Sequence, residues 1–216
     1  MKKTGTRVSL RQMNKIITVA FSLFLLTQAA LASEIKAMIG MNWSKYLFSG
    51  EINSLERQQK TGFGMGLGWA LDLNKNLKFE INILYSQKGA KAALPFATDN
   101  DISGIYKNST IAVPFFLKYK FKDQASPYAA LGPEFIFIVA HHLQIPESED
   151  DFDLLDNTKK IVFAINTLLG YEWPMGQWGL FVEIRYSRWL SNFLIDPEAK
   201  VKSESFTFLI GGVYYL

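Results

Sequence analysis

The sequence predicts an all-β protein: an eight-stranded antiparallel transmembrane β-barrel with short periplasmic turns and four longer extracellular loops. Three observations support this prediction. Apolar and polar residues alternate with a period of two in several segments, the connections between segments alternate between short and long, and the chain opens with an export signal. A half-buried strand of a soluble protein also alternates, so the alternation is decisive only together with the other two observations.

Residues 1–32 have the composition of a secretory signal peptide. A basic stretch precedes the apolar run 16–26 and the small-x-small cleavage site Ala30-Leu31-Ala32. The apolar run is too short for a spanning helix, which needs about 20 apolar residues. We therefore expect residues 1–32 to be cleaved off and residues 33–216 to form one barrel in the bacterial outer membrane, with Met13 as an alternative start to Met1.

Removal of the signal changes the charge balance. Five of the 23 Lys and Arg residues lie within residues 1–32, which leaves 18 against 20 Asp and Glu in the expected mature chain. The sequence pI of about 8.9 therefore gives no support to nucleic-acid binding. The chain has no cysteine, which excludes a disulfide framework, a thiol nucleophile and a Cys-ligated metal.

The alternation is clearest in residues 77–88, where apolar side chains fall on one face and Lys78, Glu80 and Lys88 on the other. In residues 61–72 glycine alternates with bulky apolar residues, which leaves interior room. We expect strands at residues 34–44, 61–72, 77–88, 109–121, 128–140, 159–173, 178–190 and 203–216. Their polar faces should point inward and their apolar faces outward, the reverse of a soluble lipocalin-like barrel, which is the alternative fold.

Short and long connections alternate along the chain. Residues 74–76, 122–127 and 174–177 are short and contain residues that favour tight turns. The long, polar connections are residues 45–60, 89–108, 141–158 and 191–202. Long loops at one end and short turns at the other are typical of outer-membrane barrels.

Four motifs carry a resemblance to a known family. They are Thr61-Gly62-Phe63, Leu84-Tyr85-Ser86-Gln87-Lys88-Gly89, Val113-Pro114-Phe115-Phe116-Leu117-Lys118-Tyr119 and Leu131-Gly132-Pro133-Glu134. On these residues the chain resembles the PorT-like outer-membrane β-barrel proteins common in Bacteroidetes, over essentially its whole mature length. The resemblance implies a barrel in the OmpX/OmpA mould and, for the namesake, an association with protein secretion. Pro114 and Pro133 match the pattern, and each removes a ladder donor, which predicts a bulge or local break.

The final residues predict recognition by the outer-membrane assembly machinery. Gly211, Tyr214 and Leu216 have the spacing of the C-terminal signal of such barrels, with Leu216 where Phe is usual. We expect the partners to be outer-membrane lipid and lipopolysaccharide, this machinery, and a protein at the loops or the periplasmic rim, and no nucleic acid.

No pattern predicts a catalytic residue, a cofactor or a metal. His141 and His142 are the only histidines, and neighbours on a strand face opposite ways, which makes them poor joint ligands. No serine lies two or four positions from either histidine and no G-x-S-x-G elbow occurs, so we do not expect a hydrolase.

An acidic loop follows the two histidines. Its order does not fit the calcium-loop spacing, so we expect a solvated loop, with divalent-cation bridging to lipopolysaccharide phosphates as the alternative. The acidic loop consists of Glu147, Glu149, Asp150, Asp151, Asp153 and Asp156.

The inward charges predict a plugged barrel. Eight strands enclose a space only wide enough for side chains, so these charges should pair with one another, with Glu80 opposite Lys118 within about one residue. We expect a non-enzymatic structural, interaction or secretion-assembly component. The alternatives are an ion or proton path, and a small lipid- or hydrophobe-binding barrel, including the case of an enzyme that modifies outer-leaflet lipid. The expected interior charges are Lys78, Glu80, Lys118, Lys120, Glu134, Glu172, Glu183 and Arg185.

Overall fold

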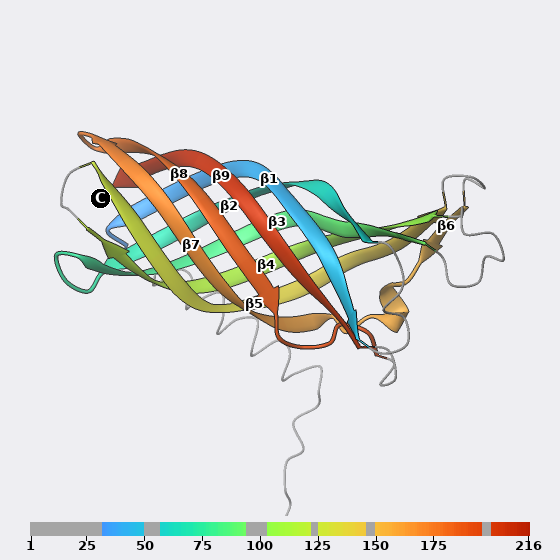
Figure 1. Ribbon diagram of the computed structural model, residues 1–216. Coiled ribbons are helices and arrows are strands. Elements are labelled where there is room, and N and C mark those ends of the chain that lie inside the picture. Colours follow the sequence, from blue (N-terminus) through green and yellow to red (C-terminus); the bar gives the residue numbers. More distant parts are fainter. Residues whose placement is uncertain (1–31, 50–56, 94–102, 122–124, 146–149, 196–199) are drawn as a thin grey trace, which may run out of the picture.

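Alternating residues fold into long antiparallel strands in this computed structural model (Figure 1). The structure describes residues 32–49, 57–93, 103–121, 125–145, 150–195 and 200–216. The expected signal peptide, apart from its last residue Ala32, lies outside these residues. The long strands are β1 (Glu34–Ser49), β2 (Arg57–Asp72), β3 (Leu77–Ala93), β4 (Ser103–Lys120), β5 (Ser126–Ile145), β7 (Ile161–Met175), β8 (Trp178–Trp189) and β9 (Lys200–Tyr215).

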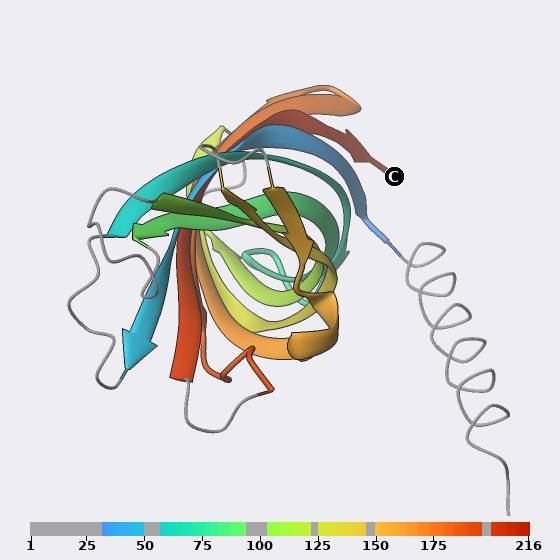
Figure 2. The ribbon, with the colours of Figure 1, turned by 90° about the vertical axis from the view of Figure 1, so that its right-hand side faces the viewer.

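The order of the strands closes the sheet into a ring. Each long strand pairs with its neighbours in the chain, and β1 also pairs with β9. A short strand, β6 (Asp150–Asp153), pairs with the outer end of β5, and the 3₁₀ turn η2 (Leu155–Asn157) follows it. Figure 2 shows the ring from the end that carries these two elements. The prediction of an eight-stranded antiparallel barrel is confirmed.

Several strands continue further toward the loop side than the alternation predicts. β3 reaches Ala93, β4 begins at Ser103 and β5 reaches Ile145. Polar residues occupy both faces there, so the sequence stops alternating although the backbone ladder continues. The expectation that residues 141–158 are all loop is wrong, because His142–Ile145 pair with Asp153–Asp150.

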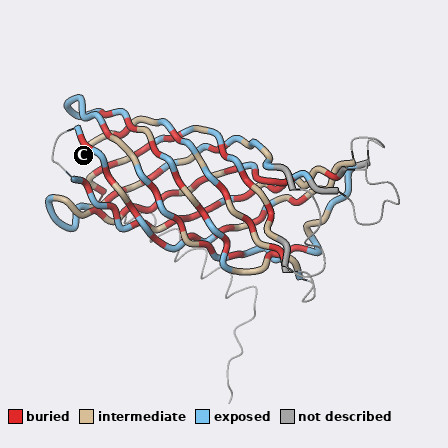
Figure 3. The backbone as a smooth tube through the Cα atoms, in the orientation of Figure 1, coloured by how far each residue is buried: buried red, intermediate tan, exposed pale blue. Residues whose placement is uncertain are grey.

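Burial alternates along the strands as the sequence predicts (Figure 3). Inward side chains are buried although many are polar, and outward side chains such as Ile39, Leu117 and Ile184 are about half exposed. Trp43 marks the loop-side edge of this apolar exterior, and Trp178 marks the turn-side edge. No helix in the described part of the chain is long and apolar enough to cross a bilayer.

Turns and ladder breaks follow from particular residues. Asn74 Oδ1 accepts hydrogen bonds from the backbone N–H groups of Asn76 (3.0 Å) and Leu77 (2.9 Å), and Gly176 adopts φ of 74° in the β7–β8 turn. Pro114 is missing from the β3–β4 ladder, and Pro133 is missing from the β4–β5 ladder. The register is the same on both sides of each proline. These are local breaks rather than bulges, because each proline lacks a donor.

Candidate functional site

The interior nearest the turns holds a group of ion pairs, which we call the turn-side charge network. β2 makes room for it. Gly68 stands opposite Lys36 on one side and Asn82 on the other, so no β2 side chain separates Lys36 of β1 from Glu80 of β3. Each member of the network is less than a tenth exposed. The members are Glu34, Lys36, Lys78, Glu80, Lys118, Lys120, Glu172, Glu183 and Arg185.

Lys36 is the central cation. Its Nζ lies 2.7 Å from Glu80 Oε2 and 3.2 Å from Glu183 Oε1. Arg185 donates to the other oxygen of Glu183 through Nε at 2.7 Å and through Nη2. Lys36 thus joins the carboxylates of β3 and β8 across the interior, and ion pairs of this kind resist separation because each charge alone would be poorly solvated.

Glu172 of β7 gathers a second set of cations. Lys120 Nζ lies 2.6 Å from Glu172 Oε1 and Lys118 Nζ lies 3.2 Å from Oε2. Lys78 pairs with Glu34 at 2.7 Å and also contacts Asp72 at the turn-side rim. With Asp72 included, the five cations of the network face five carboxylates.

Two tyrosines complete the network. Tyr128 OH donates to Glu183 (2.8 Å) and Tyr215 OH donates to Glu172 (2.8 Å). The Tyr128 ring also lies under the ammonium of Lys118, 4.0 Å from its centroid. Gly170 permits this position, because a Cβ there would be 2.3 Å from Tyr128 Cζ.

Seven of the eight expected interior charges lie in this network, and Glu134 lies apart from it. Glu134 accepts a hydrogen bond from Ser187, nearer the loops. The expected pairing of Glu80 with Lys118 is off by two residues, since the register partner of Lys118 is Lys78, but Glu80 Oε2 still lies 3.6 Å from Lys118 Nζ.

Glu34 and Lys36 were missed by the sequence analysis. They alternate with Ile35 and Ala37 in the first strand, so a face-by-face assignment of residues 34–38 would have found both. Their position directly after the expected signal peptide makes that alternation short and easy to overlook.

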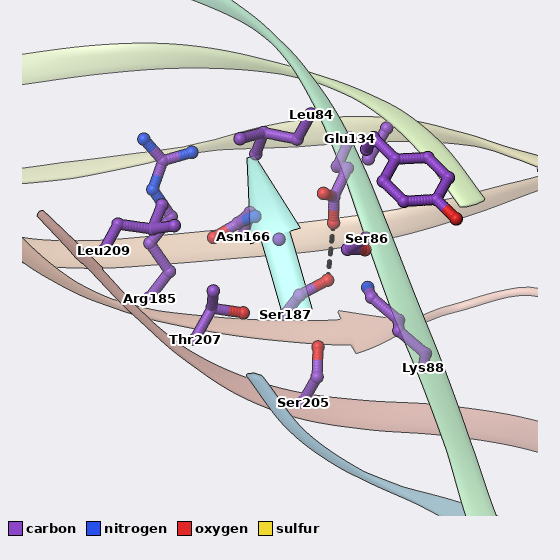
Figure 4. Close-up of a pocket in the computed structure, with 13 residues that line it drawn as sticks. Leu84, Ser86, Lys88, Glu134, Asn166, Arg185, Ser187, Ser205, Thr207 and Leu209 are labelled. Carbon is purple, nitrogen blue, oxygen red and sulfur yellow. Dashed lines mark hydrogen bonds between the residues drawn. The ribbon is translucent and has the colours of Figure 1, made fainter. Parts of the chain in front are cut away.

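A small cavity separates the turn-side charge network from the loop side (Figure 4). Its volume is about 20 Å³, and its lining includes Lys88, Glu134, Arg185, Ser187 and Ser205. The space is enough for about one water molecule. It is too small for an organic ligand.

Aromatic side chains fill the interior beyond the cavity, and we call them the mouth cluster. Phe193 is its centre, with ring centroids of Tyr46, Trp189 and His141 at 5.2, 5.4 and 5.6 Å. Tyr106 packs on Tyr46 at 6.1 Å. His141 Nδ1 hydrogen-bonds to Thr158 Oγ1 at 2.7 Å, which ties β5 to the residue after η2. The sequence pattern does not predict this cluster, because Phe193 comes from a segment without alternation.

The acidic loop is only partly described. Asp150, Asp151 and Asp153 belong to β6 and Asp156 to η2, whereas Glu147 and Glu149 lie outside the described residues. Asp151 Oδ1 lies 3.4 Å from His142 Nδ1 at the surface. No group of three or more potential metal-ligating side chains occurs among the residues with a described position.

An apolar exterior around a closed ring of strands defines the class of membrane-spanning β-barrels. Residues 27–194 match the family described as outer membrane protein beta-barrel domain. The chain belongs to this family, and it is a protein of the bacterial outer membrane.

The solved structure of another outer-membrane protein supports the fold. The chain resembles the outer membrane protein OprG from Pseudomonas aeruginosa with 11% identity and a TM-score of 0.53, over 86% of this chain and 96% of that one. Neisserial surface protein A has 13% identity and a TM-score of 0.46, over 84% and 97%. The attachment invasion locus protein Ail of Yersinia pestis has 14% identity and a TM-score of 0.44, over 85% and 99%. No curated protein matches the chain.

Proposed function

We propose that this protein is a non-conducting, non-enzymatic barrel that acts through its outward surface, its loops and its periplasmic rim. One observation carries the proposal: side chains fill the interior at two successive levels. The turn-side charge network fills the half near the turns, and the mouth cluster fills the half near the loops. A barrel of this kind serves as a structural, interaction or secretion-assembly component of the outer membrane.

An ion path would need a continuous wet route between the two ends. Lys36, Glu80, Lys118 and Glu183 are at most 1% exposed, and they contact one another through ion pairs. Separating a buried pair costs about 3–5 kcal/mol. The cavity between the two filled levels has a volume of about 20 Å³, which is room for about one water molecule and far less than a continuous water-filled path would occupy.

The described geometry gives little support to the alternative of a lipid-modifying enzyme. His141 contacts the hydroxyl of Thr158, a pairing that a nucleophile and its base would also show. Both residues are nearly fully buried, His141 as a member of the mouth cluster, with exposures of 1% and 2%. Among the described residues this burial leaves the hydroxyl inaccessible to lipid in the outer leaflet, so we assign the pair a structural role.

We also propose that the protein is a member of the PorT-like group and takes part in protein secretion. This proposal is supported by the motifs around Tyr85, Pro114 and Leu131. In the fold, Pro114 and Pro133 of those motifs cause the ladder breaks described above. A partner protein at the loops or rim, and insertion by the outer-membrane assembly machinery, would be the interactions of such a component.

Planar-bilayer recording tests the proposal. We expect the refolded protein to give no stable single-channel steps at neutral pH in 1 M KCl. A porin inserted into the same membranes provides the positive control, and the gel mobility of unheated and boiled samples verifies folding. Reproducible stepwise currents from folded, porin-free protein would overturn the plugged-barrel proposal.

A further inference from the structure

Three lysines gather on the outer surface of the barrel at its loop side, and we call them the lysine patch: Lys60 of β2, Lys91 of β3 and Lys107 of β4. The stem of Lys60 lies across Gly89, since a Cβ on Gly89 would be 2.9 Å from Lys60 Cδ. Lys107 is the register partner of Gly89, and Lys91 is two residues further along the same face. The position of Gly89 thus brings the three side chains together.

The positive charge of the lysine patch is not neutralised by the described residues. Lys60 is repelled by both Lys107 and Lys91. Lys107 Nζ donates to the neutral oxygen of Gln144, and none of the carboxylates with a described position forms an ion pair with the three ammonium groups. Like charges this close destabilise one another, so an anion bound among them would relieve the repulsion.

Other cations at the loop side differ in this respect. Lys45 lies 3.6 Å from Glu204 and Arg188 lies 3.5 Å from the same carboxylate. These two side chains are also largely exposed, at 42% and 57%. The lysine patch therefore differs from these two cations, because none of its ammonium groups has a carboxylate partner among the described residues.

The surface below the lysine patch shows what kind of anion fits. Exposed apolar side chains, among them Phe63 and Ile111, face the acyl chains of the membrane on the same strands. Four residues separate Ile111 from Lys107, a rise of about 13 Å along a strand. Thr61, Gln87 and Ser109 occupy this interval with uncharged hydrogen-bonding groups. The order is therefore apolar, neutral polar and cationic.

We propose that the lysine patch binds the phosphate groups of a phosphorylated glycolipid in the outer leaflet. Acyl chains would lie against the apolar band, sugar hydroxyls against the neutral polar interval, and phosphates among the three ammonium groups. The neutral interval favours a glycolipid over a glycerophospholipid, because a sugar unit fills the space between acyl chains and phosphate. This inference concerns the outer surface and does not depend on the plugged interior.

Binding to diphosphorylated lipid A tests the proposal. The probe is offered in phosphatidylcholine nanodiscs to the full mature protein, and native mass spectrometry measures the bound fraction. Three lysines near an anionic membrane surface contribute about a hundredfold in affinity together, so we expect the variant K60Q/K91Q/K107Q to bind lipid A about a hundredfold more weakly. The matched control K45Q removes one loop-side cation that already has a carboxylate partner, and it should bind as the wild type does.

Two further probes identify the ligand. Dephosphorylated lipid A and phosphatidylglycerol should bind the wild type weakly, and millimolar inorganic phosphate should compete only partly because it lacks sugar and acyl contacts. Equal binding of dephosphorylated lipid A, or of phosphatidylglycerol, would overturn the assignment to a phosphorylated glycolipid. Unchanged lipid A binding by the folded triple variant would overturn the site itself, and heat-dependent gel mobility shows whether that variant is folded.

Discussion

Lys36 is the residue on which the interior most depends. It is fully buried and joins Glu80 to Glu183. In the variant Lys36→Met two carboxylates would face each other without their shared cation, so we expect the free energy of unfolding to fall by about 3–5 kcal/mol. Urea unfolding in detergent, followed by tryptophan fluorescence, measures it. Lys45→Met removes a surface ion pair and should cost about 0–1 kcal/mol. Equal losses in both variants would contradict a central role for Lys36.

Gly170 leaves the space that the ring of Tyr128 occupies in the turn-side charge network. A Cβ at this position would be 2.3 Å from Cζ of Tyr128, whose hydroxyl donates to Glu183. We expect Gly170→Val to displace the tyrosine ring and to destabilise the barrel by about 1–3 kcal/mol. Gly212→Ala is the matched control, because the nearest atom to its Cβ would be 3.8 Å away. Similar midpoints of urea unfolding for the two variants would argue against close packing at Gly170.

Individual charges could be predicted from the sequence more readily than their partners. Alternation assigned Glu80, Lys118 and Glu183 to the inward face, since the side-chain period of a strand is two. The pairing of Lys36 with Glu80 depends on Gly68 of the strand between them, and no local pattern shows which residues face each other across three strands. Lys60 presents the same difficulty, because its position follows from Gly89 on the next strand.

At the scale of elements, side-chain hydrogen bonds tie β5 to the residue that follows η2. Thr158 Oγ1 bonds to His141 Nδ1 at 2.7 Å and donates to the carbonyl of Leu154 at 2.9 Å. In Thr158→Val both bonds are lost and His141 remains buried without that partner, which costs about 1–3 kcal/mol. We expect faster hydrogen exchange for the amides of residues 154–158, with exchange in β1 unchanged. Uniform acceleration across all strands would indicate global destabilisation instead.

The boundaries of elements were the part of the fold that the sequence predicted least well. Alternation reports which face meets lipid, so it ends where the apolar band ends and gives no signal for a ladder that continues into water. β6 pairs Asp151 with Gln144 and Asp153 with His142, and these polar residues look like a loop in the sequence. The turns were predictable for the opposite reason, since Asn74 and Gly176 have the local chemistry that a tight turn requires.

The whole molecule is held closed by the pairing of its first and last strands. Ile39 of β1 is the register partner of Ile210 of β9, and both side chains point outward. The sequence contains no cysteine, so a pair introduced here has no competing thiol. The Cα atoms of directly opposed residues lie about 4.5–5.5 Å apart, within the range a disulfide spans.

We therefore expect the variant I39C/I210C to form an intramolecular disulfide on mild oxidation of the folded protein. The boiled, oxidised chain should then migrate faster in gels than the boiled, reduced chain, because the covalent ring limits how far the unfolded chain expands. The control I39C/F208C places the second thiol on the same face two residues out of register, where the diagonal distance is about 7–8 Å. Its disulfide should form far more slowly. Equally fast oxidation of both variants would show that β1 and β9 slide past each other, and that the register closing the barrel is not fixed.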